Sequence, residues 1–165
     1  MTLIQPLLME LDQEAATTRR VLERMPSDKL GWKPHARARS LGELGVHIAT
    51  AQKNVSAALQ SPTFEMVPHE DSVPAKTEEI VALFDESTKE AREMLSKMTD
   101  ADLMSEWSLL VGGTPRFTAP KIGVIRGIVL NHVYHHRGQL SVYLRELGVQ
   151  VPSIYGPSAD ENPFA

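Results

Sequence analysis

Four long segments of this sequence repeat their apolar residues every three or four positions, which is the spacing of a helix that buries one face. They span residues 3–25, 41–59, 78–98 and 120–147. In the first segment the apolar stripe consists of Ile4, Leu7, Leu8, Leu11, Ala15, Leu22 and Met25. Because a one-faced helix must cover its stripe with other helices, the pattern predicts an all-α fold, a four-helix bundle.

Capping and helix-breaking residues set the limits of these predicted helices. Pro26 ends the first helix, and Ser40 followed three residues later by Glu43 is the capping-box signature at the start of the second. Pro120 suits the first turn of the fourth helix, and Gly148 suits the position just after its end.

Long connections separate helices two and three and helices three and four. Residues 60–77 contain three prolines and are predicted to be irregular. An 18-residue link can stretch to roughly 60 Å, whereas a 20-residue helix is only about 30 Å long, so helices two and three can run parallel; their direction stays open. Residues 99–119 contain a glycine pair and the apolar stretch "WSLLV", which fits a strand or a helical turn equally well. The Pro-rich tail, residues 151–165, is predicted to be non-helical.

Length and composition limit the class of protein. A chain of 165 residues suits one domain, 1–165, that folds without disulfides or a metal. Its 21 acidic and 17 basic residues are dispersed, so no basic stripe indicates a nucleic-acid partner. No apolar run approaches the roughly 20 residues that span a bilayer, and the N-terminus lacks signal-peptide features. We therefore expect a cytoplasmic protein with no membrane partner.

The stretch "NHVYHHRGQL", residues 131–140, contains three histidines within the fourth predicted helix. On a helical wheel with His132 at zero, His136 lies at about 40°, on the same apolar stripe, and His135 lies at about −60°, at its margin. Arg137 points away from this stripe, which indicates a surface or interface residue. Two imidazoles one helical turn apart can bind one ion, although an isolated pair of this kind is more often structural.

His47 is the other histidine that falls within a predicted helix. It lies at the edge of the second stripe, where it faces a neighbouring helix. Alone, such a histidine is more often a hydrogen-bonded core residue than a ligand. Together with His132 and His136, at a matching depth, it favours a three-histidine metal site. His35 and His69 lie in Pro-containing connections and are interpreted as solvated loop residues.

The chain resembles the DinB/YfiT-like family of metal-dependent bundle proteins. The stretches that carry the resemblance are "LGWKPHARARSLGELGVHIA" (30–49), "NHVYHHRGQLSVYLRELG" (131–148) and "VPSIYGPSADE" (151–161). The resemblance implies a bundle in up-down-down-up order, frequent homodimers, and a divalent metal held by His47, His132 and His136. It covers nearly the whole chain, and the sequence does not depart from the family pattern at the ligand positions. Relatives include thiol-dependent transferases and isomerases, and others known only as damage-induced.

Three neutral imidazoles leave a bound ion at least one open position, as in a catalytic site. Nitrogen ligands favour Zn or Ni, with Fe, Co or Mn also suitable. Because the chain has no Cys, thiol chemistry requires a low-molecular-weight thiol cosubstrate. We therefore expect thiol-dependent transfer, or hydrolysis by metal-activated water, on a small electrophilic substrate. The alternative is a non-enzymatic, stress-related metal-binding module whose surface recruits a partner.

Gln139 and Tyr143 lie at about −20° and 20° on the stripe of His132 and are candidate catalytic residues. Either can orient a ligand or stabilise developing negative charge. The alternatives are a packed tyrosine and a glutamine bonded to the backbone. Gly138, which lacks a side chain at about −120°, suggests close approach of another backbone.

Overall fold

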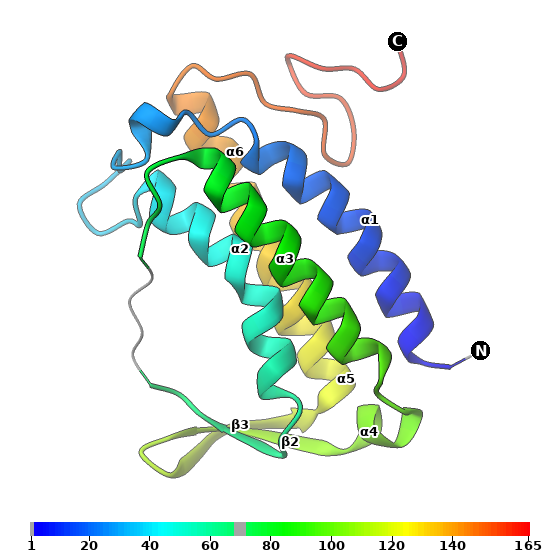
Figure 1. The fold of residues 1–165 in the computed structure, drawn as a ribbon. Coiled ribbons are helices and arrows are strands. Elements are labelled where there is room, and N and C mark those ends of the chain that lie inside the picture. The colour runs from blue at the N-terminus through cyan, green and yellow to red at the C-terminus, as the bar shows by residue number, and fades with distance from the viewer. Residues whose placement is uncertain (1, 68–71) are drawn as a thin grey trace.

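Four long helices form a bundle in the computed structural model, which describes residues 2–67 and 72–165 (Figure 1). They are α1 (Ile4–Leu22), α2 (Leu41–Ala58), α3 (Thr77–Ser96) and α6 (Asn131–Glu146). The first three begin and end within three residues of the predicted limits. His69 lies outside the described residues, so its predicted loop position is not addressed by the structure.

Local sequence signals set the ends of α2 and α6. Ser40 caps α2: its hydroxyl accepts a hydrogen bond from the backbone N–H of Glu43 at 3.1 Å, and the Glu43 carboxylate accepts one from the N–H of Ser40 at 2.6 Å. This capping box confirms the predicted start of α2. Gly148 has a φ of 71°, which favours glycine and ends the chain's helical path after α6.

Short elements fill the connections. A 3₁₀ turn, η1 (Ser27–Lys29), follows α1, and the helix α4 (Asp100–Met104) follows α3. The tail after α6 is non-helical, as predicted.

A three-stranded sheet lies at one end of the bundle, so the prediction of an all-α fold is wrong in this respect (Figure 1). Its strands are β1 (Thr63–Glu65), β2 (Glu106–Val111) and β3 (Thr114–Pro120). The central strand β2 contains the "WSLLV" stretch, and it pairs parallel with β1 and antiparallel with β3.

Two features explain why the sheet forms there. Gly112 and Gly113 have φ values of 58° and 72°, which allow the tight hairpin between β2 and β3, and their N–H groups donate to the carboxylate of Glu65. Trp107 is 3% exposed and its indole N–H donates to the carbonyl of Ala58 at 3.1 Å, which ties β2 to the end of α2. The sheet therefore closes this end of the bundle.

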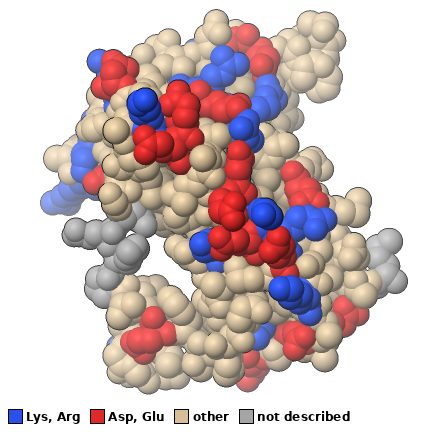
Figure 2. Space-filling model, in the orientation of Figure 1, with Lys and Arg blue, Asp and Glu red and all other residues tan. Residues whose placement is uncertain are grey.

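Side-chain contacts fix the relative directions of the helices. Helices α1 and α3 run antiparallel, whereas α2 runs parallel to α3 and α1 runs parallel to α6. The contacts that show this are Arg19–Asp85 and Asp12–Arg92 between α1 and α3, Gly45–Ile80 and Gln52–Thr88 between α2 and α3, and Glu10–Tyr134 and Glu14–Arg137 between α1 and α6. On the face drawn in Figure 2, basic side chains lie next to acidic ones.

The core runs along the bundle as two apolar clusters that Tyr134 joins. One cluster consists mainly of residues from α2, α3 and α6. The other consists mainly of residues from α1, from the end of the bundle near the sheet, and from the segment before α6. Among the described residues, no helix combines the length and the apolar character that a membrane crossing requires.

The predicted fourth helix is not uniform. It begins as α5 (Lys121–Val124), continues as a π-helical stretch, η2 (Ile125–Leu130), and becomes α-helical again in α6. A π turn contains more residues than an α turn, so residues before 131 do not stay in phase with α6. The apolar stripe that extends through Ile125 and Val129 therefore gives a false orientation for the buried face of α6.

Arg137 is 1% exposed, so its predicted surface position is wrong. Its guanidinium lies 2.7 Å from the carboxylate of Glu14, which is 6% exposed, and donates to the hydroxyl of Thr18 at 3.1 Å. The buried face of α6 consists of Val133, Arg137, Leu140 and Leu144. On the wheel this face is centred about 110° from His132, and Arg137 lies within it at about 140°.

Gly138 does not mark a close backbone approach. Within the described part of the chain, no atom outside its own helix would come within 4 Å of an added Cβ. That prediction is also wrong.

The tail covers the buried ion pair. The Tyr155 hydroxyl accepts a hydrogen bond from Arg137 at 2.6 Å and donates one to the Glu14 carboxylate at 2.9 Å. The next residues are tied down by the ion pairs Arg145–Asp160 and Arg20–Glu161. The segment after α6 is thus packed onto α1 and α6.

Replacing Arg137 with Met should lower the free energy of unfolding by about 3–5 kcal/mol, because it leaves the Glu14 carboxylate buried without a cation. Arg126→Ala is the matched control: Arg126 also pairs with an acid of α1, Glu10, but its side chain is 47% exposed. That exposed pair should contribute about 0–1 kcal/mol. Urea denaturation of both variants measures the difference, and equal losses would contradict the importance of the buried pair.

Candidate metal centre

Three half-buried histidines from α2 and α6 meet between these two helices. His47 lies in the second turn of α2, and His132 and His136 lie in the first two turns of α6. Their Nε2 atoms are 3.4 Å apart for His47 and His132, 3.1 Å for His47 and His136, and 2.9 Å for His132 and His136. The structure thus brings together the three residues that the sequence singled out, and each offers one ring nitrogen to a common point.

This triangle of nitrogens has the size that a divalent transition metal requires. Separations of 2.9–3.4 Å would let all three nitrogens lie at the usual Zn–N distance, about 2.0–2.1 Å, from one ion. Three protein ligands would leave a four-coordinate ion one further position. The arrangement therefore fits a three-histidine site with an open position.

The imidazoles are prepared to act as neutral ligands. Burial, with smaller effects from the nearby charges of Arg39 and neighbouring histidines, lowers the pKa of His47 and of His132 to about 4. Burial also lowers the pKa of His136, although the hydrogen bond to Gln139 opposes that shift. At neutral pH these rings are unprotonated, which is the form that binds a metal.

In an imidazole whose Nε2 faces the cluster, the group that contacts Nδ1 determines which ring nitrogen carries the proton. Nδ1 of His136 lies 2.7 Å from the side-chain oxygen of Gln139, so Nδ1 carries the proton and Nε2 keeps its lone pair. Nδ1 of His132 is buried and has no hydrogen-bond partner among the described residues. Buried polar atoms without a partner are rare in proteins, and here one occurs on a candidate ligand.

Tyr143 anchors the connection that leads into α2. Its hydroxyl donates to the carbonyl oxygen of Arg39 at 3.3 Å, and its ring meets Trp32 edge to face, with centroids 5.5 Å apart. Gln139 and Tyr143 thus contact His136 and the connection, respectively. Whether either contacts a substrate stays a prediction.

Arg39 is a residue that the sequence analysis did not single out. Its charge acts on all three histidines, although it is eight residues away from His47. The basic stretch "HARAR", directly before the Ser40 cap, is the signal that could have drawn attention to it.

The other described histidines lie outside the group. His135 is exposed, and its ring centre is 4.9 Å from that of His136, but its nitrogens are not part of the cluster. His35 is exposed in the connection before α2, where Nδ1 accepts a hydrogen bond from the N–H of Arg37.

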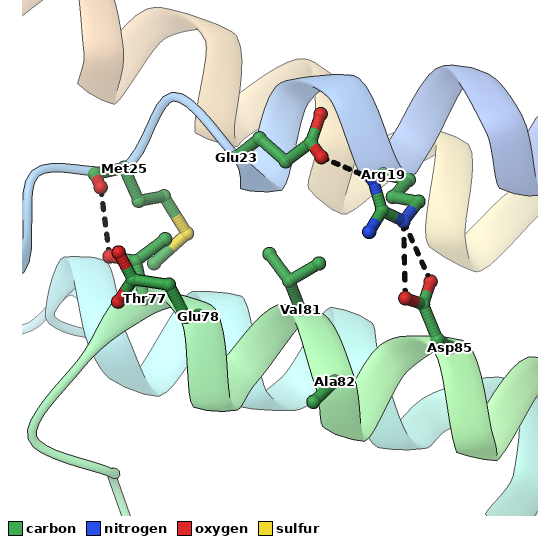
Figure 3. Close-up of a pocket in the computed structure, with 8 residues that line it drawn as sticks. All are labelled: Arg19, Glu23, Met25, Thr77, Glu78, Val81, Ala82 and Asp85. Carbon is green, nitrogen blue, oxygen red and sulfur yellow. Dashed lines mark hydrogen bonds and ion pairs between the residues drawn. The ribbon is translucent and has the colours of Figure 1, made fainter.

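A separate pocket of about 290 Å³ lies between α1 and α3 and includes none of the three histidines (Figure 3). Arg19 in its wall pairs with Glu23 and Asp85, and the hydroxyl of Thr77 donates to the carbonyl of Met25 at 2.8 Å. Because these side chains already form ion pairs and hydrogen bonds with neighbouring protein groups, the pocket is a weaker candidate site than the histidine cluster.

Similar proteins support the fold. An uncharacterized protein, YrdA of Bacillus subtilis strain 168, is 24% identical over 149 residues, which cover 90% of this chain and 85% of YrdA. The crystal structure of a DinB-like protein from Bacillus cereus ATCC 10987 superimposes with a TM-score of 0.73 and 26% identity, and covers 90% of this chain and 95% of that one.

YfiT from Bacillus subtilis is also similar, with a TM-score of 0.67 and 16% identity over 89% of each chain. It is described as a probable metal-dependent hydrolase with an unusual four-helix bundle topology. At this level of identity the similarity shows a shared fold. The sequence model of the DinB family matches residues 2–163, nearly the whole chain, and the protein therefore belongs to the DinB family.

Proposed function

We propose that this protein is a metal-dependent enzyme that holds one divalent cation through His47, His132 and His136. The observation that carries the proposal is the convergence of three Nε2 atoms within 3.4 Å of one another. The lowered pKa values and the half-buried setting of the rings support it, because they keep the ligands neutral and accessible.

The ligand set favours Zn or Ni, with Fe, Co or Mn also suitable, over the oxygen-seeking Ca and Mg. When bound at such a site, the ion supplies Lewis acidity and lowers the pKa of a water or a thiol in its open position. Gln139 orients His136 through its Nδ1, and Tyr143 holds the connection at Arg39 beside the site. Direct action of Gln139 or Tyr143 on a substrate is part of the proposal.

The proposed reaction is transfer of a group from a small electrophilic substrate to an external nucleophile. Since the chain has no Cys, a thiol nucleophile must come from a low-molecular-weight cosubstrate. The resemblance to thiol-dependent family members favours a thiol slightly, whereas the description of YfiT as a probable metal-dependent hydrolase supports water. The alternative, a non-enzymatic stress-related metal-binding module, is an outcome of the activity test below.

We further propose a cytoplasmic homodimer of single-domain chains, as the family resemblance implies. The helix directions described above support the up-down-down-up order of the bundle.

The protein should bind one Zn²⁺ or Ni²⁺ per chain. His47→Ala, His132→Ala and His136→Ala should each abolish stoichiometric binding, because two imidazoles do not complete the site. His135→Ala is the matched control, since it removes a neighbouring exposed imidazole. Elemental analysis of protein purified without a histidine tag measures the stoichiometry. Equal loss in His135→Ala would refute the assignment.

The metal-free protein should lose stability as the pH falls from about 6.5 to about 4. In this range the unfolded chain takes up protons on His47 and His132, whereas the folded chain does not, because burial lowers the pKa of both to about 4. Stability from this source is complete above pH 6.5. Urea midpoints at pH 7, 6 and 5 measure the trend, and the double variant His47→Gln/His132→Gln should show a weaker one. An unchanged trend in the double variant would rule out this origin.

The metal-loaded protein should accelerate thiol addition to small electrophiles, or hydrolysis of small esters or amides, near neutral pH. His136→Ala should abolish that activity while circular dichroism shows an unchanged helical content. A broad panel of electrophiles, assayed with and without an added thiol, separates the two nucleophiles. If the loaded protein accelerates neither reaction, the binding module replaces the enzyme.

A further inference from the structure

Three buried polar side chains of α2 and α3 have an atom without a hydrogen-bond partner among the described residues. They are Gln52, Ser56 and Ser87, and each is at most 1% exposed. The atoms are Nε2 of Gln52 and the hydroxyl oxygens of the two serines. Nearly all buried polar atoms in proteins are hydrogen-bonded, because burial without a partner costs free energy. Three such atoms on two neighbouring helices therefore indicate a site for a hydrogen-bonding molecule.

Two contacts show how α3 faces α2, which lies beside it (Figure 1). The hydroxyl of Thr88 donates to Oε1 of Gln52 at 3.1 Å, and Lys53 pairs with Glu90 at 2.8 Å. On a helical wheel of α3, Ser87 lies between Thr88 and Glu90, about 100° from the first and about 60° from the second. Since both of these residues contact α2, the side chain of Ser87 points toward α2.

The side chain of Ser56 points toward α3 for the same reason. On a wheel of α2 it lies between Gln52 and Lys53, about 40° from the first and about 60° from the second. Ser56 also follows Gln52 by one helical turn, which places their Cβ atoms about 5–6 Å apart. Gln52 and Ser87 lie at nearly the same level of the bundle, because the Gln52 amide contacts Thr88, the residue next to Ser87. The three groups thus share one stretch of the α2–α3 interface.

Small side chains flank the three groups. Ala49 precedes Gln52 by three residues on α2, and Ala91 follows Ser87 by four residues on α3. Both alanines are at most 1% exposed, so they belong to the same buried part of the two helices. A buried water requires room for about one water-sized sphere and two to four polar partners. Small residues and polar atoms coincide here, as such a site requires.

The chemistry of the three groups decides which molecule fits. The amide nitrogen of Gln52 donates hydrogen bonds, whereas a serine hydroxyl can both donate and accept. None of these groups is charged, and the neighbouring side chains of Ile80 and Phe84 are apolar and buried. An ion bound there would lose its hydration without gaining a counter-charge. A water molecule, which both accepts and donates, matches one amide and two hydroxyls.

We propose that one water molecule is bound between α2 and α3, where it accepts a hydrogen bond from the Gln52 amide and bonds to the hydroxyls of Ser56 and Ser87. It is a structural ligand that joins the two helices inside the core. Gln52 lies about 140° around α2 from His47, so this site and the histidine cluster are on different faces of the helix. The inference therefore does not depend on the proposed function.

A high-resolution crystal structure of the full chain tests the site directly. It should show a solvent molecule about 2.7–3.2 Å from Nε2 of Gln52 and from the hydroxyl oxygens of Ser56 and Ser87. A structure without a solvent molecule that contacts all three groups would overturn the proposal.

Urea denaturation tests whether the two serines share one partner. Ser56→Ala and Ser87→Ala should each lower the equilibrium constant for folding about 2- to 10-fold, the range for one buried hydrogen bond. The double variant should lose less than the product of the two single losses. The reason is that the second substitution removes a bond from a water that the first has already loosened.

Ser96→Ala is the matched control for this comparison. Ser96 also lies in α3, but it is exposed and its hydroxyl donates to the carbonyl of Glu93 at 2.9 Å. Combined with Ser56→Ala, it should give losses that multiply, since these two hydroxyls have no common partner. If the losses of Ser56→Ala and Ser87→Ala multiply in the same way, the shared water is overturned.

Discussion

The rotation of α6 about its own axis decides where its histidines point, and the buried ion pair between Arg137 and Glu14 fixes that rotation. Arg137 lies about 100° around the helix from His136 and about 140° from His132. When the Arg137 guanidinium points toward α1, the imidazoles of His132 and His136 face α2, which carries His47. Arg137, which is not one of the three histidines, thereby helps to align the candidate metal centre.

The same geometry explains why the histidines are only half-buried. The buried face of α6 is centred on Val133, Leu140 and Leu144, so the imidazoles lie at its margin. At this margin burial is sufficient to lower their pKa, yet the three residues stay partly exposed. A histidine at the centre of the face would be neutral but inaccessible, and one on the surface would be accessible but protonated more easily.

The sequence predicted the long helices and the grouping of the three histidines because the signals are local. Periodicity, caps and an i, i+4 pair are each visible in one short segment. It did not predict the sheet, because strand β1 has only three residues and pairs with a strand more than forty residues later in the sequence. It misplaced Arg137 because the stripe was drawn through residues that the π-helical stretch puts out of phase. The position of Glu14, seven residues after Leu7 on the stripe of α1, was the sequence signal that the core contains a charge needing a partner.

The C-terminal tail couples the buried Arg137–Glu14 pair to local unfolding of the tail itself. Tyr155 makes a hydrogen bond to each of Arg137 and Glu14, although the residue as a whole is 69% exposed. Detachment of the tail would remove one hydrogen bond from each member of the pair and expose the guanidinium to water, so local unfolding of the tail should weaken the α1–α6 contact. Amide hydrogen exchange in residues 151–161 therefore reports on the integrity of the contact that aligns the histidines, although those residues lie outside the bundle's helices.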